Sequence, residues 1–132
     1  MTIKGGVVVK PEKKLWHEIK TFVTENNRKL SFTRVENSVS WGTPDLLGYN
    51  NNNHFFTVEL KATRTNKVRL SPHQIAFHVK HPDNTFILVK ALSLNLVKLY
   101  EGKVIKELDA CGLTLEACAS GLDACCLRLE SC

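Results

Sequence analysis

The chain has 132 residues, 43% of them apolar and 23% charged, as expected for a globular domain that buries a core. No apolar run approaches the roughly 20 residues that span a bilayer, and the N-terminal run is too short for a signal peptide, so we expect a cytoplasmic protein without a membrane partner. The net charge is +5, but residues 1–107 carry +8 and residues 108–132 carry −3. The basic part favours a polyanionic partner, nucleic acid first, although solubility alone can also explain it.

The first predicted elements are a helix and two strands. Pro11 suits the first helical position, and an apolar stripe at helical spacing continues to about residue 27. Alternating apolar and polar residues predict a strand over 30–36, and a second short strand covers 44–49. The helical stripe consists of Leu15, Trp16, Ile19, Phe22 and Val23.

A hairpin is expected around the four asparagines at 50–53, because a strand pattern over 54–62 follows them. Ser71 as N-cap, Pro72 at the next position and Gln74 three residues after the cap predict a second helix that begins with a capping box.

The last predicted elements of the domain are a central strand and a hairpin. The continuous apolar run Thr85–Val89 is typical of a strand that is covered on both faces, and 97–100 with 103–105 read as a hairpin. The order α-β-β-β-α-β with an appended C-terminal hairpin predicts one α/β domain with a mixed sheet over residues 1–107.

From Leu108 a seven-residue repeat begins, with leucines at 108, 115, 122 and 129 and cysteines at 111, 118, 125 and 132. On a helix these residues would form one seam, which favours self-association or docking of residues 108–132; a poorly ordered tail is the other interpretation. Gly112 and Gly121 each cost such a helix about 1 kcal/mol. Cysteines seven apart on one helix lie roughly 10 Å from each other, too far to share a zinc ion.

Three charged residues stand out in the strand region. Asp45 follows Pro44, and Glu59 and Lys61 alternate with apolar residues on the predicted strand 54–62, so both project to the same face. Two carboxylates held close together repel each other, and a divalent cation offsets that repulsion. The alternative is a surface Glu–Lys pair beside an unrelated aspartate. The carbonyl of Leu60 can supply a further hard oxygen ligand.

Pro44-Asp45 followed by Glu59-Leu60-Lys61, in this element order, resembles the PD-(D/E)XK nuclease superfamily. Gly42-Thr43-Pro44-Asp45-Leu46 and Leu70-Ser71-Pro72-His73-Gln74 resemble more narrowly the virus-type replication-repair nuclease (VRR-NUC) domain. The likeness covers residues 10–90 and does not include the leucine and cysteine repeat. It implies a restriction-endonuclease-like αβββαβ core.

The resemblance also implies roles for single residues. Asp45 and Glu59 would bind Mg²⁺ or Mn²⁺, and Lys61 would be the catalytic lysine. Glu18 would match a further metal-binding acid on the first helix, although from the sequence pattern alone it reads as a solvated side chain. Gln74 would face the active site in addition to its capping role.

Small domains of this type resemble phage and bacterial enzymes that cut branched DNA, such as four-way Holliday junctions, during replication, recombination or repair, often as homodimers. We therefore expect a Mg²⁺-dependent, structure-selective endonuclease; a non-catalytic DNA-binding module with the same fold and a partner-recruiting tail is the alternative. The residues expected to contact DNA are Arg34, Asn37, Arg64, Lys67, Arg69 and His73.

Overall fold

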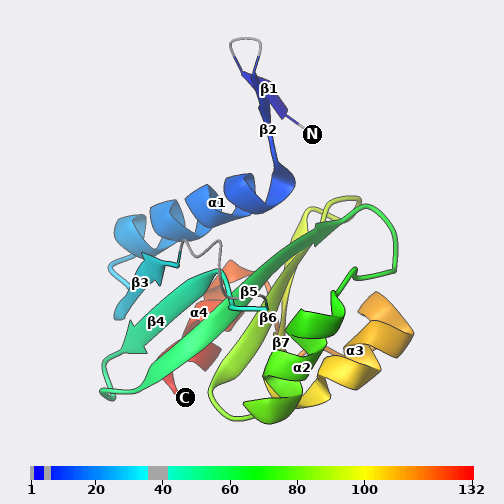
Figure 1. The fold of residues 1–132 in the computed structure, drawn as a ribbon. Helices are drawn as coiled ribbons and strands as arrows, with labels where there is room; N and C mark the ends of the chain where they lie inside the picture. Colours follow the sequence, from blue (N-terminus) through cyan, green and yellow to red (C-terminus); the bar gives the residue numbers. More distant parts are fainter. Residues whose placement is uncertain (1, 5–6, 36–41) are drawn as a thin grey trace.

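The protein is built around one six-stranded mixed sheet (Figure 1). A computed structural model describes residues 2–4, 7–35 and 42–132. The strands lie in the order β3-β4-β5-β6-β7-β8, and the β5–β6 pair is parallel while the other pairs are antiparallel. Their bounds are β3 Leu30–Arg34, β4 Leu46–Asn50, β5 Phe55–Thr63, β6 Thr85–Ala91, β7 Leu96–Glu101 and β8 Ala119–Ser120. A separate hairpin of β1 (Thr2–Lys4) and β2 (Val7–Val9) precedes the first helix.

Four α-helices accompany the sheet in the described ranges, and they divide its core in two. Their bounds are α1 Pro11–Glu25, α2 Pro72–Lys80, α3 Ile105–Cys111 and α4 Leu122–Glu130. Leu15 of α1 and Leu129 of α4 share one apolar cluster with Phe56 of the sheet. Ile105 of α3 belongs to a second cluster with Ile87, whose side chain lies on the opposite sheet face. None of the described helices is long and apolar enough to cross a membrane.

The predicted α-β-β-β-α-β order is confirmed by α1, β3, β4, β5, α2 and β6, and each of these elements lies within about two residues of its expected bounds. The capping box is also confirmed. The Ser71 hydroxyl accepts a hydrogen bond from the Gln74 backbone N–H at 3.1 Å, and the Gln74 side-chain oxygen accepts one from the Ser71 N–H at 2.9 Å.

The predicted C-terminal hairpin is wrong in its second strand. Residues 102–104 form a 3₁₀ turn that leads into α3, and β7 pairs with β6 and β8 instead. Ile105 and Leu108, three residues apart, are both fully buried, which is the spacing of a helix face rather than of a strand. The segment Lys103-Val104-Ile105 is too short to distinguish the period of a helix from that of a strand.

The prediction of one helical seam over residues 108–132 is also wrong. The expected boundary after residue 107 falls inside α3, and the segment continues through a 3₁₀ turn and β8 to α4. Gly112 and Gly121 have φ of +60° and +88°, a left-handed conformation that interrupts any continuous helix. Leu108 and Leu129 are buried in the two different core clusters, so they are not available as a seam between chains.

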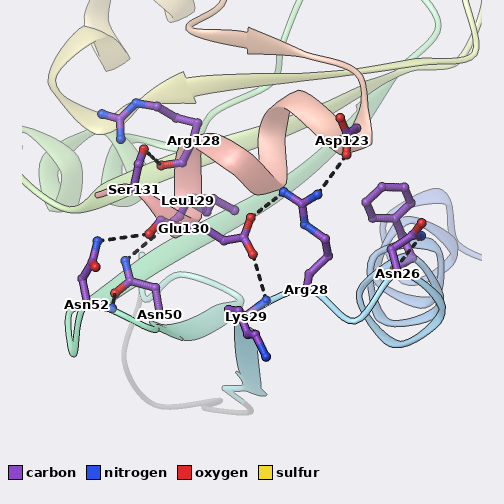
Figure 2. Close-up of polar contacts among 11 residues, drawn as sticks. Asn26, Arg28, Lys29, Asn50, Asn52, Asp123, Arg128, Leu129, Glu130 and Ser131 are labelled. Carbon is purple, nitrogen blue, oxygen red and sulfur yellow. Dashed lines mark hydrogen bonds and ion pairs between the residues drawn. The ribbon is translucent and has the colours of Figure 1, made fainter.

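Helix α4 is tied to the turns that flank β3 and β4 (Figure 2). The Arg28 guanidinium is paired with the Glu130 carboxylate, whose other oxygen accepts a hydrogen bond from the Lys29 N–H at 2.8 Å. The buried Asn50 donates from its Nδ2 to the Leu129 carbonyl at 2.9 Å. Residues 122–130 are therefore an integral layer of the domain.

Candidate active site

Glu59 is a buried acid in the middle of β5. Along β5, Val58 and Leu60 point to the face covered by α1 and α4, so Glu59 and Lys61 point to the opposite face. The side chain of Glu59 is only 3% exposed. Among the described residues its Oε1 has no hydrogen-bond partner, which leaves a hard oxygen ligand atom unused.

Asp45 lies beside Glu59 because β4 and β5 are neighbours. Leu46 is in register with Val58, which places the preceding Asp45 next to Glu59 on the same face. The Leu60 N–H donates a hydrogen bond to Asp45 Oδ2 at 2.8 Å. Since the N–H and C=O of one strand residue point to the same edge of the strand, the Leu60 carbonyl points toward the β4 side of β5.

The two carboxylates share their environment. Burial, followed by the hydrogen bond to Asp45 and the charge of Asp45, raises the pKa of Glu59 from 4.5 to about 9, while Lys61 opposes the shift. Without a cation, Glu59 therefore holds its proton at neutral pH. The structure thus brings Asp45, Glu59 and Lys61 close together.

Glu18 does not join this group. Its Oε2 lies 2.9 Å from Lys90 Nζ, and Lys90 is in register with Ala62, on the α1 face of the sheet. Glu59 points to the other face. The expectation that Glu18 is a metal ligand is therefore not supported by its position, because a buried lysine of β6 holds its carboxylate elsewhere.

Glu12 is the helix-borne acid that lies near the site, and sequence reasoning missed it. Its charge contributes to the raised pKa of Glu59, and its side chain lines a pocket together with Lys61. A signal was present, because Glu12, Leu15 and Ile19 follow the i, i+3, i+7 spacing of one helix face. Glu12 itself is exposed in the first turn of α1, where it lines the pocket beside the end of β5.

The two motifs that carried the resemblance touch each other. Gly42 has φ of +80°, and a Cβ built on it would lie 2.4 Å from the backbone carbonyl oxygen of His73. The 42–45 segment therefore rests on the N-terminus of α2, in a conformation that only glycine allows. The Gln74 side-chain oxygen accepts a hydrogen bond in the capping box. No described contact supports the expectation that Gln74 approaches the two carboxylates.

The expected DNA-contacting residues are divided among three places. Arg64, Lys67 and Arg69 lie on the loop after β5 and, with Lys61 and Glu12, line a pocket of about 300 Å³. His73 is exposed at the start of α2, and Arg34 is exposed at the end of β3, next to Val35, whose N–H donates to the Asp45 carbonyl. Asn37 lies outside the described residues.

The donor set fits Mg²⁺ or Mn²⁺. No group of three or more His, Cys, Asp or Glu side chains in the described part of the chain is arranged to hold a metal ion. Mg²⁺ does not need one, because it binds through one or two carboxylates and keeps waters and substrate phosphates as its other ligands. Asp45, Glu59 with its unpartnered oxygen and the Leu60 carbonyl supply that smaller set.

Comparison with protein-family models finds no matching family for this chain, and comparison with curated proteins finds no match either.

Proposed function

We propose that this protein is a Mg²⁺- or Mn²⁺-dependent endonuclease of the PD-(D/E)XK type that hydrolyses DNA phosphodiester bonds. The observation that carries the proposal is the buried Glu59 carboxyl, with one unpartnered oxygen, beside Asp45 and on the same strand face as Lys61. A fold keeps two such carboxylates in contact at a cost that a divalent cation offsets. The basic lining of the neighbouring pocket suits a polyanionic substrate such as DNA.

The residues divide the chemistry between them. Asp45, Glu59 and the Leu60 carbonyl would hold the divalent ion, which supplies an acidified water and neutralises charge that builds on phosphorus. Lys61 is placed to donate to that water or to a non-bridging phosphate oxygen. Arg64, Lys67 and Arg69 hold the DNA backbone in register without reading bases.

The substrate class follows from the resemblance. We propose branched DNA, such as a four-way junction, cut by a homodimer whose two sites act on two strands. The close approach of Gly42 to the His73 backbone supports the resemblance on which this proposal rests, because it brings the two motif segments side by side.

The test is cleavage of a labelled four-way junction and of a matched linear duplex with Mg²⁺. We expect Lys61→Ala and Glu59→Gln to lower the rate at least about 100-fold, and EDTA to abolish cleavage. Glu18→Gln is the matched control, since it removes an acid on the other face and should leave the rate unchanged. Cleavage that survives Lys61→Ala or EDTA would sink the mechanism. Salt-sensitive DNA binding without cleavage of either substrate would favour a non-catalytic DNA-binding module.

A further inference from the structure

The pocket beside Lys61 is a concentration of positive charge. Lys61, Arg64, Lys67 and Arg69 line its volume of about 300 Å³, and Glu12 is the one acid in the lining. The formal charge of the lining is therefore +3. Because Lys61 belongs both to this pocket and to the strand face of Glu59, the pocket continues directly from the candidate active site.

The loop that carries the cations is held by its own hydrogen bonds. The Thr63 hydroxyl donates to the Lys67 carbonyl at 2.8 Å and accepts from the Thr65 N–H at 3.2 Å. The Thr65 hydroxyl accepts from the Lys67 N–H at 3.2 Å. Val68, between two exposed cations, is 1% exposed and packs in the core cluster of α3. The loop backbone is thus fixed while the charged ends stay in solvent.

The loop tip is also held by the corner that follows α3. The Leu113 N–H donates to the Asn66 carbonyl at 2.8 Å, and Asn66 Nδ2 donates to the Cys111 carbonyl at 3.1 Å. Between them, Gly112 approaches so closely that a Cβ would lie 2.1 Å from the Asn66 carbonyl oxygen. A segment of the leucine and cysteine repeat, to which the nuclease chemistry gives no role, therefore shapes the basic loop.

We propose that this pocket is a preformed subsite for one phosphate of the cut strand, adjacent to the scissile phosphate, and that residues 111–113 position it. The inference rests on the proposed function for the identity of the strand. A phosphate diester offers the anionic oxygens that several lysine and arginine donors bind, and a loop already fixed loses little entropy when it binds. The contact is the same before and during the reaction, so it should contribute uniform binding.

The experiment compares two glycine substitutions. Gly112→Ala introduces a Cβ that collides with Asn66. Gly121 has a similarly positive φ, but a Cβ added there in Gly121→Ala lies within 4 Å of no other atom of the described residues. Both should lose some stability from backbone strain. We expect Gly112→Ala alone to raise the KM for the DNA junction about tenfold while kcat stays within twofold, as loss of uniform binding requires. Equal KM values for the two variants would overturn the positioning role.

A second pair keeps the test decisive if Gly112→Ala does not fold. Asn66→Ala removes only the bond to the Cys111 carbonyl and should raise KM in the same direction by a smaller factor. Lys67→Ala should lower the slope of log affinity against log salt by about 1 in magnitude. Lys103→Ala, which removes an equal charge from a lysine paired with Glu101 outside this pocket, should leave the slope unchanged.

The inference and the proposed function fail separately. Affinity for a fluorescein-labelled DNA duplex can be measured by anisotropy in EDTA, without cleavage. If Lys61→Ala abolishes cleavage but Gly112→Ala, Asn66→Ala and Lys67→Ala all match the wild type in KM and salt slope, the subsite is wrong and the nuclease stands. If nothing is cleaved but Lys67→Ala lowers the salt slope and Lys103→Ala does not, the nuclease is wrong. Only the phosphate-binding part of the inference then stands, because there is no cut strand. Absence of any DNA binding overturns both.

Discussion

The Glu18 carboxylate lies 2.9 Å from the Lys90 ammonium, on the face of the sheet opposite to Glu59. Lys90 is 8% exposed in a strand that is buried along its whole length, so its charge needs this partner. The acid for which the resemblance implies a metal-binding role thus neutralises a buried lysine.

Glu18→Gln should therefore affect stability and not activity. Removal of the carboxylate leaves a buried ammonium with a weaker partner, and we expect a loss of about 1 to 3 kcal/mol in the free energy of unfolding. Urea denaturation measures it, and Lys90→Met in the same background should recover most of the loss. A cleavage rate that falls with stability intact would instead place Glu18 in the active site.

Glu12→Gln should shift the pH profile of cleavage. The Glu12 charge raises the pKa of Glu59, so its removal makes Glu59 easier to ionise. We expect the acid limb of the rate profile to move to lower pH, as measured by initial rates across a buffer series. Glu107→Gln, an exposed acid on α3, is the control and should leave the limb in place. If the acid limb of the rate profile does not move in Glu12→Gln, Glu12 is not part of the site.

Glu59→Gln should stabilise the metal-free protein in alkaline solution. The folded protein binds the Glu59 proton more tightly than the unfolded chain, with a pKa of about 9 against 4.5. Its contribution to stability is therefore complete below pH 4.5 and is lost progressively as the pH rises toward 9. In EDTA we expect the variant to exceed the wild type by about 1 to 3 kcal/mol at pH 8 and to match it near pH 4.5.

Added Mg²⁺ should reverse that comparison at pH 8, because the ion binds the folded wild type and not the variant. Thermal unfolding with and without Mg²⁺ measures the effect. A wild type that is indifferent to Mg²⁺ at this pH would contradict the metal assignment.

Leu129→Ala should be far more damaging than Leu127→Ala. Leu129 is 3% exposed and lies in the main core cluster, whereas Leu127 on the same helix is 55% exposed. We expect losses of about 2 to 5 kcal/mol and under about 0.5 kcal/mol respectively, measured by chemical denaturation. Similar small losses in both would mean that α4 is peripheral to the domain.

Gly42→Ala should destabilise the protein by disrupting the contact between the two motif segments. The new Cβ meets the His73 backbone and the φ of +80° is unfavourable for alanine, so we expect a loss of about 2 kcal/mol or more. Gly121→Ala suffers the backbone strain without the collision and sets the reference. If the two variants lose the same stability, the contact between Gly42 and His73 contributes nothing.

The central elements were predictable because their signals are local. The alternation around Glu59, the capping box at Ser71 and the helical stripe at Leu15 each depend on residues a few positions apart. The same alternation placed Glu59 and Lys61 on one face. Asp45 joined them because its strand is a hairpin neighbour of β5.

The remaining features depend on contacts distant in sequence. The pair of Glu18 with Lys90 spans 72 residues, and the bond of Lys29 to Glu130 spans 101, so no local pattern reports either. The seven-residue repeat was misleading for a related reason. Its leucines have the right spacing for one helix, but Gly112 and Gly121 interrupt the segment. Leu108 and Leu115 then pack on one side of the sheet and Leu129 on the other.

Helix α4 also has a consequence for the order in which the chain can fold during synthesis. The α4 side of Phe56 and Leu30 is covered by Cys125, Cys126 and Leu129 only when a segment 62 to 66 residues beyond the end of β5 has been made. At the usual rates of translation the apolar face of β3–β5 stays exposed for several seconds before α4 has been synthesised. During synthesis the strands β3–β5 therefore expose apolar surface that can associate with chaperones or with other chains.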